Sequence, residues 1–132
     1  MNIQYKDSKS ITAEELSSVF QLSGITRPYQ DLDRLERMIT HSDLLITAWD
    51  EEKMVGVARA VTDFSYCCYL SDLAVDASYQ KYGIGKELVR RVQEQAGEEC
   101  ALLLISAPSA VDYYPKIGFA QSDRAFLIPR AK

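Results

Sequence analysis

The run Tyr69-Leu-Ser-Asp-Leu-Ala-Val75, followed after a short polar turn by Gln80-Lys-Tyr-Gly-Ile-Gly85, is the most informative part of this chain. Apolar residues dominate the first run, which predicts a buried strand, and the second run leads straight into a helix that extends to about Ala96. The first N–H groups of a helix lack intrahelical partners and lie at the positive end of its dipole. The glycines at 83 and 85 let an anion approach these groups closely. We therefore expect a phosphate site where this helix begins.

Two common glycine-rich phosphate motifs do not fit this spacing. A P-loop needs four residues between its first glycine and Gly-Lys-Ser/Thr, whereas one residue separates Gly83 from Gly85, and Lys86 precedes Glu87. The dinucleotide-binding fingerprint would need a third glycine where Leu88 stands. The remaining pattern, Gln-x-x-Gly-x-Gly after a strand ending in Leu-Ala-Val, resembles the acyl-CoA-binding motif of the GCN5-related N-acetyltransferase (GNAT) family.

A second segment, Ala110-Val-Asp-Tyr-Tyr-Pro-Lys-Ile-Gly-Phe119, resembles the C-terminal signature of the same family. It follows the apolar run Ala101–Ser106, which predicts another buried strand, at the distance expected in the family. The two motifs occur in the family's order, and the resemblance covers roughly residues 44–122. The stretch Ser106-Ala-Pro108 with the tyrosine motif is loosely similar to the arylalkylamine and plant serotonin-type branch.

The order of the expected elements is that of the GNAT fold, and the length of 132 residues predicts one domain over residues 1–132. The resemblance implies an α/β fold with a mixed central sheet, in which the parallel strands at 69–75 and 101–106 splay apart, flanked by about four helices. The first expected helix begins at the capping box Thr12-Ala-Glu-Glu15. Further helices are expected over Asp31–His41, residues 83–96 and a short stretch before Phe119. The other expected strands are Met1–Tyr5, Leu44–Trp49, Met54–Val61 and a closing hairpin of Phe119–Asp123 and Phe126–Pro129.

Composition excludes several other classes of protein. A net charge of −4 and a pI near 5.0 argue against a nucleic-acid partner. No apolar run approaches 18 residues and the first residues do not read as a signal peptide, so we expect a cytoplasmic protein without a membrane partner. Three cysteines and one histidine cannot supply an ordinary four-ligand zinc site, and we expect no metal.

The resemblance implies acetyl-CoA as the cosubstrate. Its pantetheine arm would lie in the splay and pair with backbone groups of the strand, and its pyrophosphate would bind at the start of the helix. Many relatives carry Asn seven residues before the motif tyrosine, where this chain has Ala107, so Ser106 or the backbone must replace that contact. The residues expected to bind the cofactor are Leu73, Ala74, Val75, Gln80, Lys81, Tyr82, Gly83, Ile84, Gly85, Lys86 and Ser106.

Two residues are catalytic candidates. Tyr114 occupies the position of the family's motif tyrosine, whose phenol can donate a proton to the leaving thiolate. Asp72 interrupts an apolar strand and is a candidate base for the amine, but an ion pair with Arg59 on the preceding strand explains it as well. Tyr113 is expected to pack in the core, because adjacent helical residues point in different directions.

The expected function is N-acetyl transfer to a primary amine, by direct attack in a ternary complex. A small-molecule amine is favoured over a protein amine, and Arg27, Tyr29 and Arg59 are the candidate acceptor-binding residues. The alternative is a non-catalytic acyl-CoA-binding sensor or partner subunit, because the Asn is absent and no base is unambiguous. A homodimer through the edge formed by the C-terminal hairpin is a further expectation.

Overall fold

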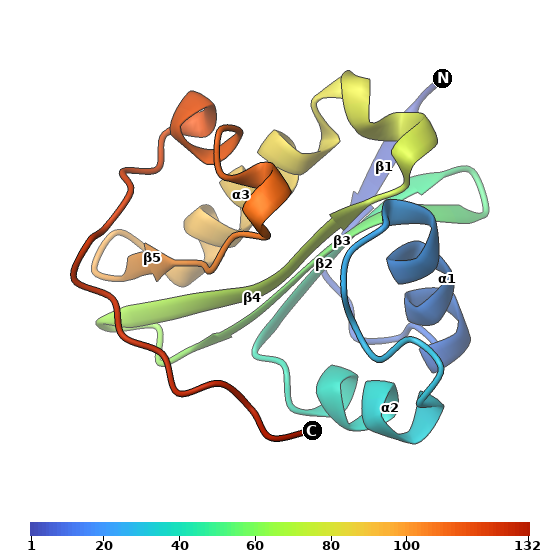
Figure 1. Ribbon diagram of the computed structural model, residues 1–132. Coiled ribbons are helices and arrows are strands. Elements are labelled where there is room, and N and C mark those ends of the chain that lie inside the picture. Colours follow the sequence, from blue (N-terminus) through green and yellow to red (C-terminus); the bar gives the residue numbers. More distant parts are fainter.

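Five strands form one mixed sheet, and helices cover both of its faces (Figure 1). The computed structural model describes all residues from Met1 to Lys132. The sheet has the order β1-β2-β3-β4-β5, in which neighbours pair antiparallel except β4 and β5, which are parallel. The strands are β1 (Ile3–Lys6), β2 (Leu44–Asp50), β3 (Lys53–Thr62), β4 (Cys67–Val75) and β5 (Ala101–Leu103). The helices are α1 (Ala13–Ser23), α2 (Leu32–Thr40) and α3 (Ile84–Ala96), with short 3₁₀ segments η1 (Ala77–Tyr82), η2 (Pro108–Ala110) and η3 (Tyr114–Ile117).

The first helix begins and ends where local chemistry dictates. Thr12 Oγ1 accepts a hydrogen bond from the Glu15 N–H at 3.0 Å, and Glu15 Oε1 accepts one from the Thr12 N–H at 2.9 Å, which confirms the predicted capping box. Gly24 ends α1 with φ = 78°, a conformation that costs other residues energy. This turn sends the loop at residues 25–30 toward β4.

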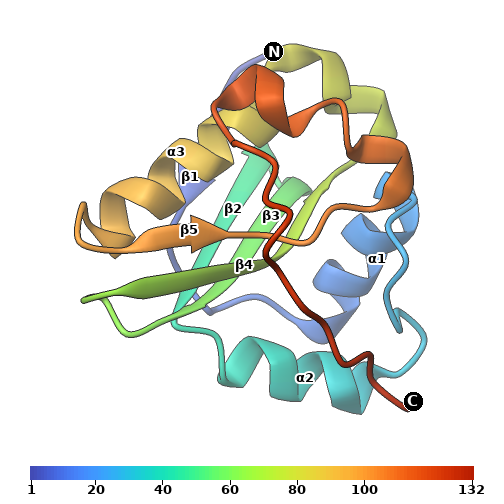
Figure 2. The same cartoon turned by 60° about the vertical axis from the view of Figure 1, so that its left-hand side comes forward.

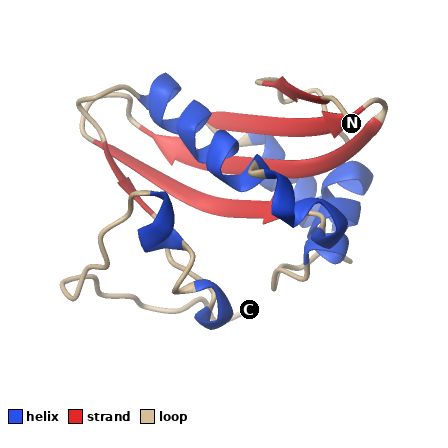
Figure 3. Ribbon diagram, turned by 90° about the horizontal axis from the view of Figure 1, so that it is seen from above, coloured by secondary structure: helices blue, strands red, loops and turns tan.

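Two apolar layers hold the helices on the sheet. One joins α3 to one sheet face through Ile84, Leu88 and Val92, and the other joins α1 and α2 to the opposite face. Figure 3 shows α3 running along one side of the strands. A Cβ added at Gly56 of β3 would lie 3.2 Å from Ile84 Cγ2 and 3.3 Å from Leu88 Cδ1. Glycine at this position therefore allows the start of α3 to pack closely on the sheet.

A β-bulge in β4 decides which side chains face which layer. Arg59 of β3 pairs with Asp72 while its neighbour Ala60 pairs with Leu70, so Ser71 is an extra residue. Before the bulge Leu70 faces α3, and after it Leu73 and Val75 do so. Asp72 is thereby turned toward the face covered by α1 and α2, because side chains alternate along a strand.

The predicted α/β fold, with a mixed central sheet flanked by helices, is confirmed, with two corrections near the C-terminus. The predicted strand Ala101–Ser106 ends at Leu103, because β4 bends away from it. The predicted hairpin of Phe119–Asp123 and Phe126–Pro129 is wrong, since the structure contains no strand after β5. The three-residue β5 offers too short an edge for the hairpin to extend the sheet. The last residues instead cross the open side of β4 and β5 toward α2, where Arg34 Nη2 donates to the Lys132 carbonyl at 3.0 Å (Figure 2).

Candidate active site

The two parallel strands separate after a short paired stretch. β4 and β5 pair only between Cys67–Tyr69 and Ala101–Leu103. The bulge at Ser71 bends β4, and the chain beyond Leu103 leaves the ladder. One edge of β4 consequently has no neighbouring strand from Ser71 to Val75.

The unpaired edge carries the backbone groups of alternate residues. Asp76 donates its N–H to the Val55 carbonyl at 2.8 Å, so Asp76 faces β3. Because the direction of antiparallel hydrogen bonds alternates along a strand, Leu73 and Val75 direct their N–H and C=O groups away from β3. These groups point to the side that β5 has left open.

Two side chains occupy the ends of this edge. Gln80 Nε2 donates to the Val75 carbonyl at 3.0 Å, and Arg27 Nη2 donates to the Ser71 carbonyl at 2.7 Å. Leu73 lies between them, and its N–H and C=O are left for a ligand. An extended ligand backbone can pair with such an edge as an added strand would.

A groove follows this edge. A cavity of about 550 Å³ lies between β4 and the chain after β5, and one of about 330 Å³ continues it to Gly85 at the start of α3. We call these two adjoining cavities the β4 groove. A cavity of about 650 Å³ lies elsewhere, near Gly97 at the end of α3, and no residue of the two motifs lines it. The residues that line both parts of the β4 groove are Leu73, Val75, Gln80, Ser109, Ala110 and Tyr114.

The first turn of α3 lies at one end of the groove and has the features of an anion site. Gly83 precedes the helix with φ = 75°, and no side chain caps the first turn. Glu87 adds no unpaired negative charge there, because its carboxylate accepts hydrogen bonds from Arg90 and Arg91. These hydrogen bonds also lower the pKa of the carboxyl to about 2. The exposed amines of Lys81 and Lys86 leave this end of the groove positive.

Tyr114 lies where the two parts of the groove meet. It packs edge-on against Tyr113 and Phe119, with ring centroids 5.3 and 5.6 Å apart. Burial raises the pKa of the Tyr114 phenol, so the hydroxyl is protonated at neutral pH and can donate a proton or a hydrogen bond. Tyr113 is not in the core as expected: it is 38% exposed, and a Cβ added at Gly85 would lie 2.8 Å from its hydroxyl.

Comparison with known proteins identifies the family. The model of the acetyltransferase (GNAT) domain matches residues 10–127. The chain belongs to the GNAT family. GCN5-related N-acetyltransferase 1, chloroplastic, of Arabidopsis thaliana is 30% identical over 118 residues, which are 86% of this chain and 59% of that protein. Serotonin N-acetyltransferase 2, chloroplastic, of Oryza sativa subsp. japonica is 27% identical over 129 residues, which are 91% of this chain and 62% of that protein.

The chain thus spans about three fifths of the length of these two curated relatives. A solved structure, AAC(6′)-Iy with the bisubstrate analogue CoA-S-monomethyl-acetylneamine, superposes with a TM-score of 0.74 at 16% identity. The superposition covers 98% of this chain and 99% of that one, and it shows that the fold is shared. None of the helices in the present structure is both long and apolar enough to cross a membrane.

The structure brings half of the sixteen expected site residues to the lining of the β4 groove. Seven line its larger part, namely Arg27, Leu73, Ala74, Val75, Gln80, Ser106 and Tyr114, and Gly85 lines its smaller part. Lys81, Tyr82, Gly83, Ile84 and Lys86 surround the start of α3 without lining the groove; Ile84 is buried, so only its backbone can reach a ligand there. The motifs missed Leu127 and Arg130, which line the groove from a C-terminal segment that lies outside both motifs.

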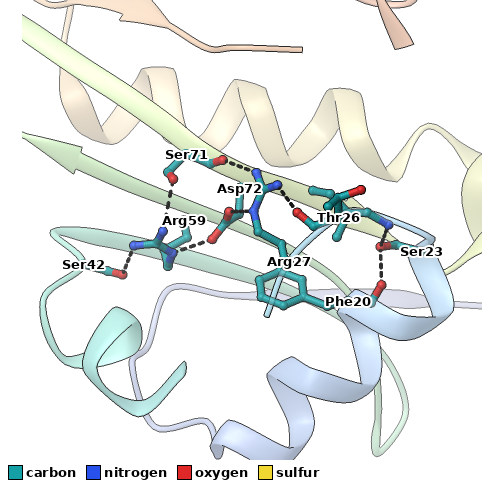
Figure 4. A network of polar contacts seen from close by, with 9 residues as sticks. Phe20, Ser23, Thr26, Arg27, Ser42, Arg59, Ser71 and Asp72 are labelled. Carbon is teal, nitrogen blue, oxygen red and sulfur yellow. Dashed lines mark hydrogen bonds and ion pairs between the residues drawn. The ribbon is translucent and has the colours of Figure 1, made fainter. Parts of the chain in front are cut away.

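Three other expected site residues lie outside the groove. Tyr29 packs against the layer formed by α1 and α2, and its carbonyl accepts a hydrogen bond from Ser17 Oγ at 2.7 Å. Asp72 is 1% exposed and Arg59 is 9% exposed. Figure 4 shows Asp72 between the side chains of Arg59 and Arg27. Arg59 Nε and Arg27 Nε each donate to one carboxylate oxygen of Asp72 at 2.5 Å. The ion pair with Arg59 is confirmed, and Arg27 is a second partner that the sequence did not predict.

We expect Asp72→Asn to lower the free energy of unfolding by about 3–5 kcal/mol, because it leaves two guanidinium groups without their shared buried counter-charge. Urea denaturation measures this change. The matched variant Asp112→Asn alters an exposed carboxylate and should stay within about 0.5 kcal/mol of the wild type. An Asp72→Asn protein with wild-type stability and no acetyl transfer would instead make Asp72 the catalytic base.

Proposed function

We propose that this GNAT domain transfers an acetyl group from acetyl-CoA to a primary amine, by direct attack in a ternary complex. The observation that carries the proposal is the unpaired edge at Leu73, which lines the same groove as Tyr114 and Gly85 of the first turn of α3. Acetyl-CoA links a thioester, an amide-containing arm and a pyrophosphate in that order, and these groups complement the Tyr114 phenol, the Leu73 edge and the first turn of α3 respectively. The CoA-containing bisubstrate analogue named for a protein of the same fold supports acetyl-CoA as the ligand.

Residues of this chain would bind each part of the cosubstrate. The N–H groups of Leu73 and Val75 would pair with the pantetheine arm or hold the thioester carbonyl oxygen, on which negative charge develops during attack. The backbone N–H groups at the first turn of α3, with Lys81 and Lys86 beside them, would bind the pyrophosphate. The protonated Tyr114 phenol would donate to the departing thiolate.

One observation favours a second function, a non-catalytic acyl-CoA-binding protein. No carboxylate or imidazole lines the β4 groove, and Asp72 is held by two arginines. An ammonium group near pKa 10 must lose its proton before attack, so in an enzyme the proton would pass to solvent at the open side of the groove. A small-molecule amine stays the favoured acceptor. A cytoplasmic location stays a prediction, and the names of the two relatives, which refer to the chloroplast, do not support it.

Acetyl-CoA is expected to raise the thermal unfolding midpoint of the wild type. At a hundredfold excess over its dissociation constant a ligand adds about 2.7 kcal/mol, which corresponds to roughly 5–10 °C in a domain of this size. Gly83→Asp should abolish the shift, because it places a negative charge at the start of α3. Gly83→Asn has the same shape and also tolerates positive φ, so it should retain most of the shift. Equal shifts in both variants would contradict a pyrophosphate site here.

Tyr114→Phe is expected to lower kcat for acetyl transfer about 10²- to 10⁴-fold and to keep the thermal shift with acetyl-CoA, because only the proton donor is lost. Release of free CoA with a panel of primary amines measures turnover. Tyr66→Phe is the matched control, since Tyr66 is 80% exposed in the β3–β4 turn. If the wild type binds acetyl-CoA and releases no CoA with any amine, the non-catalytic alternative holds.

A further inference from the structure

The larger part of the β4 groove has an unusual balance of charge. The chain as a whole is acidic, with 19 Asp and Glu against 15 Lys and Arg. Among the 22 residues that line the larger part of the groove, however, the charged ones are Arg27 and Arg130, and both are positive. The smaller part of the groove has no charged lining residue. The groove is therefore positive within a negative protein, and charge at close range governs which ligands enter it.

Arg27 keeps part of its charge and hydrogen-bonding capacity for a ligand. Its buried partner Asp72 is shared with Arg59, so this cluster of three side chains carries a net positive charge (Figure 4). The Arg27 guanidinium makes three hydrogen bonds, to Asp72, to the Thr26 carbonyl and to the Ser71 carbonyl. Further N–H groups remain, and the side chain is 26% exposed. The carboxylate that balances part of the charge lies behind it, away from solvent.

Arg130 supplies a second guanidinium to the lining of the groove. It belongs to the C-terminal segment that crosses the open side of β4 and β5 (Figure 2). It forms no salt bridge, in contrast to Arg90 and Arg91 on α3, whose charges are taken by Glu87 and Glu94. The same cavity is also lined by Tyr69 and Leu127, whose side chains suit a short apolar spacer.

We infer that the acceptor is a short amine that carries an anionic group, a carboxylate or a phosphate-type group, which Arg130 and Arg27 bind together. This inference rests on the proposed function and specifies its substrate class. Guanidinium groups bind both kinds of anion with paired hydrogen bonds. Arg27 donates to the carbonyl of Ser71, which is two residues from Leu73. Two fully extended residues span about 7 Å, and the bulge at Ser71 makes this an upper limit. A chain of three or four carbons therefore separates the reacting amine from the anion. Acceptors with several positive charges, such as polyamines, are disfavoured.

The test compares four amines of matched length: 4-aminobutyrate, 3-aminopropylphosphonate, butylamine and 1,4-diaminobutane. We expect kcat/KM to be at least tenfold higher for an anionic amine than for butylamine, and lowest for the diamine. The comparison of 4-aminobutyrate with 3-aminopropylphosphonate distinguishes a carboxylate from a phosphate-type acceptor. Arg130→Gln should raise KM for the anionic amines about ten- to a hundredfold, and leave the constants for butylamine and KM for acetyl-CoA unchanged. Arg124→Gln is the matched control, because Arg124 lies in the same segment and does not line the groove.

Other outcomes overturn the inference in distinguishable ways. If butylamine or the diamine is used as well as the anionic amines, the proposed function stands and the anionic acceptor is wrong. If Arg130→Gln raises KM for acetyl-CoA, the arginine binds the cosubstrate instead. If no amine is acetylated, the proposed function fails, and calorimetry with 4-aminobutyrate and CoA then tests the anion site alone. Binding that Arg130→Gln weakens would support the anion site, and the absence of binding would overturn it.

Discussion

The unpaired edge of β4 is the constraint on which the candidate site depends. A buried backbone group that lacks a hydrogen-bond partner costs free energy, so a strand that leaves its neighbour needs substitutes. The bulge at Ser71 creates this situation by bending β4 away from the three-residue β5. Arg27 and Gln80 supply substitutes at the two ends, through the carbonyls of Ser71 and Val75. The Leu73 groups between them are left for an extended ligand.

The same bulge also sets the electrostatics of the site. By shifting the alternation of side chains it turns Asp72 toward α1 and α2, where Arg59 and Arg27 both reach its carboxylate. The carboxylate is thus removed from the groove while a guanidinium remains beside it. One extra residue in a strand therefore accounts for the open edge, for the buried ion cluster and for the absence of an acidic group where the acceptor would bind.

The features that follow from short stretches of sequence were predicted well. The strand before Gly83, the start of α3, the capping box at Thr12 and the place of Tyr114 all depend on neighbouring residues, and the structure contains each of them. Pairing between distant segments was harder to predict. Arg27 is 45 positions from Asp72, and nothing near either residue indicates the contact.

The C-terminal segment shows the same limit. Its residues were predicted as a hairpin from their composition, but a strand forms only where another edge is long enough to pair with, and β5 ends at Leu103. The segment therefore crosses the groove, and the contribution of Arg130 depends on this path. Family motifs located the groove, while its charged lining came from residues outside them.

Amide hydrogen exchange with and without CoA tests the account most directly. Leu73 and Val75 present their N–H groups to the open edge, whereas the N–H groups of Asp72 and Ala74 already face β3. CoA is expected to slow exchange at the amides of Leu73 and Val75 and at the first turn of α3. The amides of Asp72 and Ala74 should change much less. If CoA protects no amide of β4, or protects all four equally, ligand pairing with this edge would be contradicted.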